Sequence, residues 1–285
     1  MADDPKTLVS TDWLAARLAM PDLRILDGSW FLPTDTRNGQ SEYDKAHIPG
    51  ARFFDIDDIS DHRSDLPHMA PPIEKFMSRL RAMGVGDGHQ VAVYDQGPGM
   101  FSAARVWWTF RLMGKTDVAV LDGGLAKWQA EGRPVEDMPP VIRDRHMTVS
   151  RQAQLVKDVT QVAHASKLRD FEIIDARSAP RFKGEAPEPR AGLRAGHIPG
   201  SKNVPYTALF RDDGTMLDPD GLRKVFEAAG VDLSKPAITT CGSGVTASVL
   251  ALAMERLGKA DWSVYDGSWT EWGANPMLKI ETGEA

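Results

Sequence analysis

The chain contains two copies of one sequence pattern. The segment 46–56 (AHIPGARFFDI) returns at 196–206 (GHIPGSKNVPY), and 120–128 (VLDGGLAKW) returns at 264–272 (VYDGSWTEW). The spacing of about 150 residues is far longer than the repeat of a solenoid, so it indicates two domains of the same fold. We expect these domains at 1–140 and 155–285, with a charged linker at 141–154 after two adjacent prolines.

Within each copy, short β-rich segments alternate with helical ones. The patterns RILDGS, QVAVYD, VAVLDGG, FEIIDAR, AITTC and WSVYDGS predict buried strands. Helices are expected at TDWLAARLA, with Thr11 as N-cap, and at IEKFMSRLRAMG, DGLRKVFEAAG and ASVLALAMERLG. This alternation predicts an α/β fold, with a parallel sheet covered on both faces and ligands bound beyond the carboxyl ends of the strands.

Composition excludes several classes of function. The net charge of −6 does not suit a general nucleic-acid binder, and no segment is apolar enough for a membrane span. The single cysteine cannot form an internal disulfide or a cysteine-built zinc site, and the seven histidines lack metal-site spacing, so we expect no metal. With no secretory signal pattern, we expect a reducing, cytoplasmic location.

The single cysteine, Cys241, lies between a predicted strand and a helix expected from about Val245. A helix N-terminus exposes unpaired peptide N–H groups, which stabilise a thiolate or a persulfide. Gly242 and Gly244 permit positive φ, so the loop can curl round the sulfur. A purely structural cysteine needs no such position.

Three chemistries compete for this thiol. A cysteine-dependent phosphatase needs an arginine six residues after the cysteine, where this chain has Ala247. A disulfide oxidoreductase needs a second cysteine, which is absent. A sulfur carrier or transferase needs only one thiol, so that interpretation survives.

The loop CGSGVTAS, the paired HIPG motifs and the YDGSWTEW segment together resemble the tandem-domain rhodanese-like sulfurtransferases over nearly the whole chain. The form CGSGVT is similar to members that use 3-mercaptopyruvate, since thiosulfate-using members typically carry Arg and Lys where this chain has Gly242 and Ser243. The resemblance implies a five-stranded parallel sheet in each domain, no cofactor, and catalysis by the second domain alone. In the first domain Asp95 falls where Cys241 lies in the second, and an aspartate cannot carry sulfur.

The resemblance also implies a set of site residues. Arg181 and Arg190 match substrate-binding arginines, which suit a small 2-oxo acid. Gly242, Gly244, Val245 and Thr246 would surround the donor. Ser243, His68 and Asp57 match a serine-centred triad for proton transfer, with His62 as the competing histidine and the first domain contributing to the cleft.

Other motifs have structural explanations. His47 and His197 occur in both copies although only one copy has the cysteine, so we expect each to tie a Pro-Gly turn to its own domain. The tryptophans at 107, 108, 128, 269 and 272 are expected in the core or at an interface.

The sequence therefore predicts a sulfurtransferase that moves sulfur from 3-mercaptopyruvate through a Cys241 persulfide to cyanide or to a thiol, such as that of thioredoxin. A thiosulfate sulfurtransferase of the same fold and a non-catalytic persulfide carrier remain the alternatives. Arg181 and Arg190 favour an enzyme, because a pure carrier needs no pocket for a small acid.

Overall fold

The computed structural model describes residues 3–32, 34–97 and 99–284. Its chain divides into two compact units. The first comprises Met1–His62, Ala70–Gln152 and Arg211–Met216; the second comprises Arg63–Met69, Ala153–Phe210 and Leu217–Ala285. Each unit is an α/β domain.

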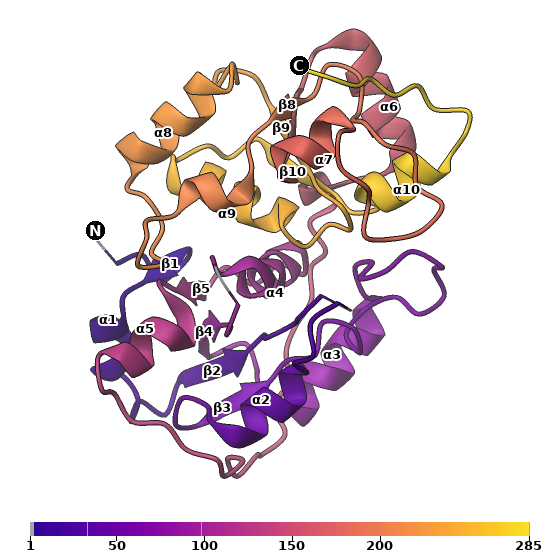
Figure 1. Cartoon of the computed structure of the whole chain (residues 1–285). Coiled ribbons are helices and arrows are strands. Elements are labelled where there is room, and N and C mark those ends of the chain that lie inside the picture. The colour runs from indigo at the N-terminus through magenta and orange to yellow at the C-terminus, as the bar shows by residue number, and fades with distance from the viewer. Residues whose placement is uncertain (1–2, 33, 98, 285) are drawn as a thin grey trace. The chain divides into compact units, whose positions relative to one another are not determined.

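The first unit contains a five-stranded parallel sheet in the order β1-β5-β4-β2-β3. Its strands are β1 (Leu8–Val9), β2 (Leu23–Asp27), β3 (Ala51–Phe53), β4 (Gln90–Tyr94) and β5 (Val118–Leu121). Its helices are α1 (Thr11–Ala15), α2 (Gly39–Lys45), α3 (Ile73–Ala82), α4 (Phe101–Leu112) and α5 (Gly124–Ala130). These elements run from indigo to magenta in Figure 1.

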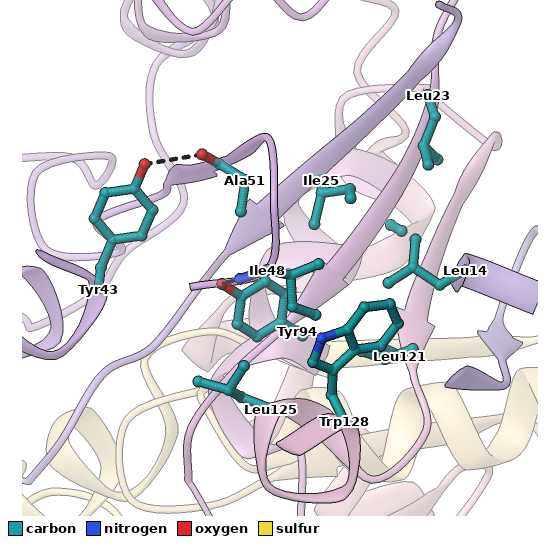
Figure 2. Packing of buried hydrophobic residues seen from close by; sticks show 11 residues of the cluster. Leu14, Leu23, Ile25, Tyr43, Ile48, Ala51, Tyr94, Leu121, Leu125 and Trp128 are labelled. Atoms are coloured by element: carbon teal, nitrogen blue, oxygen red, sulfur yellow. Dashed lines mark hydrogen bonds between the residues drawn. The ribbon is translucent and has the colours of Figure 1, made fainter. Parts of the chain in front are cut away.

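Helices cover both faces of this sheet. On one face, Leu14 of α1, Tyr43 of α2 and Trp128 of α5 pack in one apolar cluster with residues of β2 and β4 (Figure 2). A second aromatic group lies apart from that cluster, where Phe110 of α4 meets Phe76 of α3 at 5.3 Å between ring centroids. A parallel sheet buried on both faces is the arrangement that its nearly continuous apolar strands require.

The second unit repeats the plan, with the strand order β6-β10-β9-β7-β8. Its strands are β6 (Val156–Lys157), β7 (Glu172–Asp175), β8 (Lys202–Asn203), β9 (Ala237–Thr240) and β10 (Trp262–Tyr265). Its helices are η1 (Ala153–Leu155), α6 (Val159–Leu168), α7 (Ala179–Lys183), η2 (Tyr206–Leu209), α8 (Pro219–Ala228), α9 (Ala247–Arg256) and α10 (Ser268–Ala274). Residues from α6 and α10 pack in one cluster with β7, β9 and β10.

The predicted fold class is confirmed, with two corrections at helix ends. All six predicted strands form. The N-cap of α1 is Ser10, whose hydroxyl accepts the N–H of Trp13, so Thr11 is the first helical residue and not the cap. Helix α9 begins at Ala247 rather than near Val245, because the chain turns at Gly244 with φ +78° before the helix starts.

The tryptophans expected inside the protein are buried. Trp107, Trp108, Trp128, Trp269 and Trp272 are each at most 2% exposed. Arg194 binds carbonyl groups at the end of α10, including those of Trp272 and Gly273. It therefore acts as a C-terminal helix cap.

The two HIPG motifs form matching internal contacts. His197 stacks on Phe182 with 3.8 Å between ring centroids, and its Nδ1 lies 2.9 Å from the Phe182 carbonyl. A two-way backbone bridge joins His197 to Glu281, whose carboxylate also accepts the N–H of Gly200 at 2.9 Å. His47, Tyr43, Gly50 and Glu136 repeat these contacts in the first unit.

These contacts confirm the structural role expected for both histidines. Each histidine ties its turn to a later segment of its own unit, and a glutamate on that segment satisfies the N–H of the turn glycine. Without the glutamate, the N–H of each half-buried turn glycine would depend on water for an acceptor.

Asp95 follows β4 and occupies an anion-binding loop of the first unit. Its carboxylate accepts the N–H groups of Gly97, Ser102 and Ala103 at 2.8–3.2 Å, together with the hydroxyl of Ser102. Burial raises the pKa of Asp95 to about 6, against the opposing effect of the donors on Ala103 and Ser102. The first unit therefore fills its own loop with a carboxylate.

Replacing Glu281 by Ala tests the contact that closes the second HIPG turn. The substitution removes the acceptor for Gly200 N–H, so the free energy of unfolding should fall by about 1 kcal/mol in urea titrations. Glu284→Ala is the matched control, because Glu284 pairs with Lys183 at an exposed position where an ion pair contributes little. An equal loss in both variants would contradict the assigned role of Glu281.

Replacing Asp95 by Asn tests the buried carboxyl. A folded-state pKa raised above the unfolded value stabilises the fold below about pH 3.8, and this stabilisation is lost as the pH rises through about 6. Wild type should therefore lose roughly 3 kcal/mol relative to Asp95→Asn across that window. Denaturant titrations at several pH values measure the difference in free energy of unfolding between the two proteins. A hydrogen bond lost in the variant changes that difference by the same amount at every pH, so only a change with pH reports the titration of Asp95. A difference that does not vary with pH would show that Asp95 titrates normally.

Candidate active site

The candidate site lies at the carboxyl end of the second sheet. Strand β9 lies between β7 and β10, so Asp175, Thr240 and Tyr265 end three adjacent parallel strands. Cys241 directly follows β9 and is 2% exposed. The structure thus places the thiol where parallel α/β sheets present their ligand sites.

The start of α10 holds the backbone of the cysteine. Cys241 N–H donates to the hydroxyl of Ser268 at 3.2 Å, and the Cys241 carbonyl accepts the N–H of Trp269 at 3.0 Å. The next carbonyl, of Gly242, accepts both the N–H and the hydroxyl of Thr270 at 2.9 and 2.7 Å. The position of Cys241 is therefore fixed from both sides of its peptide backbone.

The loop after Cys241 presents peptide donors that the protein does not use. Within the described chain, the N–H groups of Gly242, Ser243, Val245 and Thr246 donate to no other protein group. The corresponding loop of the first unit also has six residues between strand and helix, and there the N–H of Gly97 in the loop and those of Ser102 and Ala103 in α4 donate to the carboxylate of Asp95. The N–H groups of the second loop are therefore available to a negatively charged group.

The two loop glycines have different functions. Gly244 has φ +78°, as expected for a residue that lets the loop curl. Gly242 does not have positive φ, so that part of the sequence interpretation is wrong. Gly242 is instead constrained by space, because a Cβ there would lie 3.1 Å from Nη2 of Arg181.

Arg181 lies beside this loop, on α7. Its Nη2 donates to Glu188 at 2.5 Å, and its side chain remains 25% exposed. Within the described residues Nη1 of Arg181 makes no hydrogen bond. The arginine is thus held by a carboxylate while one edge of its guanidinium group stays available.

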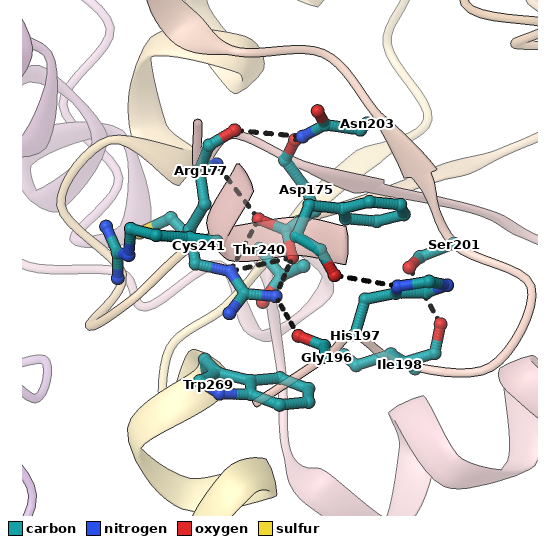
Figure 3. Close-up of polar contacts among 12 residues, drawn as sticks. Asp175, Arg177, Gly196, His197, Ile198, Ser201, Asn203, Thr240, Cys241 and Trp269 are labelled. Atoms are coloured by element: carbon teal, nitrogen blue, oxygen red, sulfur yellow. Dashed lines mark hydrogen bonds and ion pairs between the residues drawn. The ribbon is translucent and has the colours of Figure 1, made fainter. Parts of the chain in front are cut away.

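A buried ion-pair network that the sequence interpretation missed supports Arg181. Arg177 bonds to Asp175 through Nε and Nη2, and its guanidinium lies 4.3 Å from the ring of Trp269 (Figure 3). Its Nη1 donates to Glu188 at 2.7 Å. Burial lowers the pKa of Arg177, but the carboxylates of Asp175 and Glu188 outweigh burial and leave it raised. Two arginines and two carboxylates balance in charge, which makes their joint burial tolerable. The sequence signal that could have indicated this network is the position of Arg177, two residues after the end of a strand.

Arg190 and His68 lie together in the second unit. Nη2 of Arg190 is 3.5 Å from Nε2 of His68, and because a guanidinium group only donates, this imidazole nitrogen is the acceptor. His68 is 7% exposed and has φ +60°, an uncommon conformation for a non-glycine residue. The competing His62 is exposed, and its Nε2 contacts the carbonyl of Asp57 at 2.9 Å.

The remaining triad residues lie in different units. Ser243 is 7% exposed in the cysteine loop of the second unit. Asp57 belongs to the first unit, where it is exposed and accepts Nε1–H of Trp30 at 2.8 Å. The triad of Ser243, His68 and Asp57 stays a prediction, as do the roles of Val245, which is buried, and Thr246, which is half-buried.

Across residues 3–32, 34–97 and 99–284, no group of three or more His, Cys, Asp or Glu side chains is arranged to hold a metal ion. No helix in that part of the chain has the length and apolar character of a membrane span.

Comparison with known proteins identifies the family. The model of the rhodanese-like domain matches residues 10–131 and again 157–275. "Thiosulfate/3-mercaptopyruvate sulfurtransferase 1, mitochondrial" of Arabidopsis thaliana is 46% identical, over 98% of this chain and 79% of that protein. The 3-mercaptopyruvate sulfurtransferase of Escherichia coli K12 is 43% identical, over 96% of this chain and 97% of that protein.

A solved structure agrees with these sequence matches. The crystal structure of SseA from Escherichia coli, described as a 3-mercaptopyruvate sulfotransferase with the rhodanese fold, superposes with a TM-score of 0.84 and 41% identity. The match covers 92% of this chain and 98% of SseA. The chain therefore belongs to the rhodanese-like domain family, with two such domains in tandem.

Proposed function

We propose that this chain is a sulfurtransferase that takes sulfur from 3-mercaptopyruvate onto Cys241 and passes it to a thiol, releasing pyruvate. The observation that carries the proposal is the set of peptide N–H groups after Cys241 that have no acceptor within the described protein. Such donors suit a charge that is present only during turnover, on a thiolate or a terminal persulfide sulfur.

The first half-reaction needs a nucleophile and a stable leaving group. The Cys241 thiolate attacks the sulfur of 3-mercaptopyruvate, a sulfur–sulfur bond forms and the carbon–sulfur bond breaks. Its electron pair passes to the carbon and gives the enolate of pyruvate, which then takes a proton. His68 is our candidate for moving that proton, with Ser243 and Asp57 completing the relay.

The arginines recognise the acid group of the donor. A carboxylate is best bound by guanidinium groups, and Arg181 lies next to the cysteine loop with Nη1 available. Arg190 contacts His68, so a donor carboxylate bound there lies close to the proton relay. This arrangement favours a catalyst over a pure persulfide carrier, which has no use for a small-acid pocket.

In the second half-reaction an acceptor thiolate attacks the outer sulfur of the persulfide and restores the Cys241 thiolate. The acceptor is a small thiol or a protein thiol such as that of thioredoxin, or cyanide in an assay. Because acceptor thiols must stay reduced, the proposal places the protein in a reducing compartment, the cytoplasm.

Donor choice depends on the charge next to the thiol. Thiosulfate and its sulfite leaving group carry more negative charge at the reacting end than 3-mercaptopyruvate does. Gly242 and Ser243 provide no cation there. The positive charge of Arg181 and Arg190 suits a carboxylate at the far end of the donor, which favours 3-mercaptopyruvate over thiosulfate.

Steady-state kinetics with both donors test the proposal. Wild type should show kcat/KM for 3-mercaptopyruvate about 10- to 150-fold above that for thiosulfate, the value of one charged hydrogen bond. Cys241→Ser should remain folded and release no pyruvate, because an alcohol oxygen cannot form the persulfide. Preference for thiosulfate would support the rival enzyme, and transfer without pyruvate release would support the carrier.

Adding charge to the loop should redirect donor choice. Ser243→Lys places a cation near the thiol and should raise kcat/KM for thiosulfate roughly tenfold. A side chain at 242 would also crowd Arg181, so Gly242→Arg combines two effects. Gly242→Ala is the control that measures crowding without added charge. No gain with thiosulfate in Ser243→Lys or in the Gly242→Arg, Ser243→Lys double variant would show that donor choice lies elsewhere.

A further inference from the structure

The first turn of α10 contacts the cysteine loop through successive residues. The Ser268 hydroxyl accepts Cys241 N–H, Trp269 N–H donates to the Cys241 carbonyl, and Thr270 donates twice to the Gly242 carbonyl. The second bond from Thr270, at 2.7 Å, comes from its hydroxyl group, so it requires a residue with a side-chain donor at this position.

Holding a carbonyl also fixes the next peptide N–H. In a trans peptide the carbonyl and the N–H point in opposite directions, and the described chain has no cis peptide bond. With its carbonyl directed at Thr270, the Gly242–Ser243 peptide must direct the Ser243 N–H away from α10. The Cys241–Gly242 peptide does the same for the Gly242 N–H, through Trp269.

These two N–H groups belong to the set that has no protein acceptor. The contacts with α10 therefore determine the direction of donors that are available to an anion at Cys241. If the Gly242 peptide turned over, its carbonyl oxygen would replace the Ser243 N–H on that side and repel negative charge.

The first unit provides an internal comparison. Leu125 N–H donates to the Asp95 carbonyl at 3.1 Å, as Trp269 does to Cys241. The position of Thr270 is occupied there by Ala126, which has no hydroxyl. The side-chain hydrogen bond is therefore present in the unit that contains Cys241 and cannot form in the first unit.

Ser268 also differs from the equivalent residue of the first unit. It has φ +50° and is fully buried, where the first unit has Gly124 with φ +56°. Glycine adopts this conformation with less strain than serine. The serine side chain has a use in the second unit that glycine cannot supply, because its hydroxyl accepts the N–H of the nucleophilic cysteine.

We propose that Thr270 is a positioning residue for sulfur transfer, fixing the Gly242 peptide so that the Ser243 N–H faces the charged sulfur on Cys241. Ser268 supports the same loop from the other side of the cysteine. The inference rests on the proposed function for its role in turnover, but its effect on the thiolate is independent of the donor.

The first experiment measures the thiol without any sulfur donor. Cys241 is the only thiol in the chain, so alkylation by iodoacetamide reports on it alone. Thr270→Val keeps a branched side chain and removes the hydroxyl, so the pH midpoint of the alkylation rate should rise by about half a unit to one unit. Thr270→Ser keeps the hydroxyl and should retain the wild-type midpoint.

The second experiment measures turnover of 3-mercaptopyruvate. Thr270→Val should lower kcat roughly three- to tenfold and leave KM within about twofold, because the lost interaction acts on the charged sulfur. Thr270→Ser should restore kcat. If Thr270→Val does not fold, Thr270→Ala, which reproduces the residue of the first unit, takes its place.

The outcomes separate the two proposals. A shifted alkylation midpoint in a protein that releases no pyruvate would refute the donor and leave the positioning role standing. An unshifted midpoint in folded Thr270→Val, or equal impairment of Thr270→Ser and Thr270→Val, would overturn the role of Thr270.

Discussion

The proposed chemistry depends on peptide N–H groups at the end of β9 that have no acceptor among the described residues. An unpartnered donor beside a buried residue is costly in a folded protein, so its persistence requires a rigid surround. Parallel pairing of β9 with β7 and β10 fixes where the strand ends, and α10 fixes the carbonyls of Cys241 and Gly242. The loop between them keeps N–H groups that are available to a negative charge.

The two units show how one loop supports two outcomes. The first unit fills its loop with the carboxylate of Asp95, which is permanently attached and cannot react as a sulfur nucleophile. The second unit places Cys241 at the same point of the fold, and in the described chain the N–H groups of Gly242 and Ser243 donate to no protein acceptor. The two loops therefore share length and place in the fold but differ in their contacts, since the N–H groups of Ser248 and Val249 donate to carbonyls of the second loop itself.

The features predicted correctly from the sequence are those that depend on a local pattern of residues. The six long strands and the position of Cys241 follow from apolar runs ended by Gly and Asp. The short strands β1, β3, β6 and β8 were missed because two or three residues at a sheet edge carry no periodic pattern. The pairing of Arg177 with Glu188 and the bond from Thr270 to Gly242 depend on tertiary contacts between separate segments. The resemblance to a family indicated Arg181 but not the carboxylate that holds it.

The central claim is that Cys241 carries the transferred sulfur, and peptide mass spectrometry tests it most directly. Purified protein is exposed to 3-mercaptopyruvate without an acceptor, and its peptides are then analysed under non-reducing conditions. The account predicts the added mass of one sulfur atom on the peptide containing Cys241, and its loss on adding a thiol acceptor. Added sulfur on another peptide, or none on Cys241 while pyruvate is released, would contradict it.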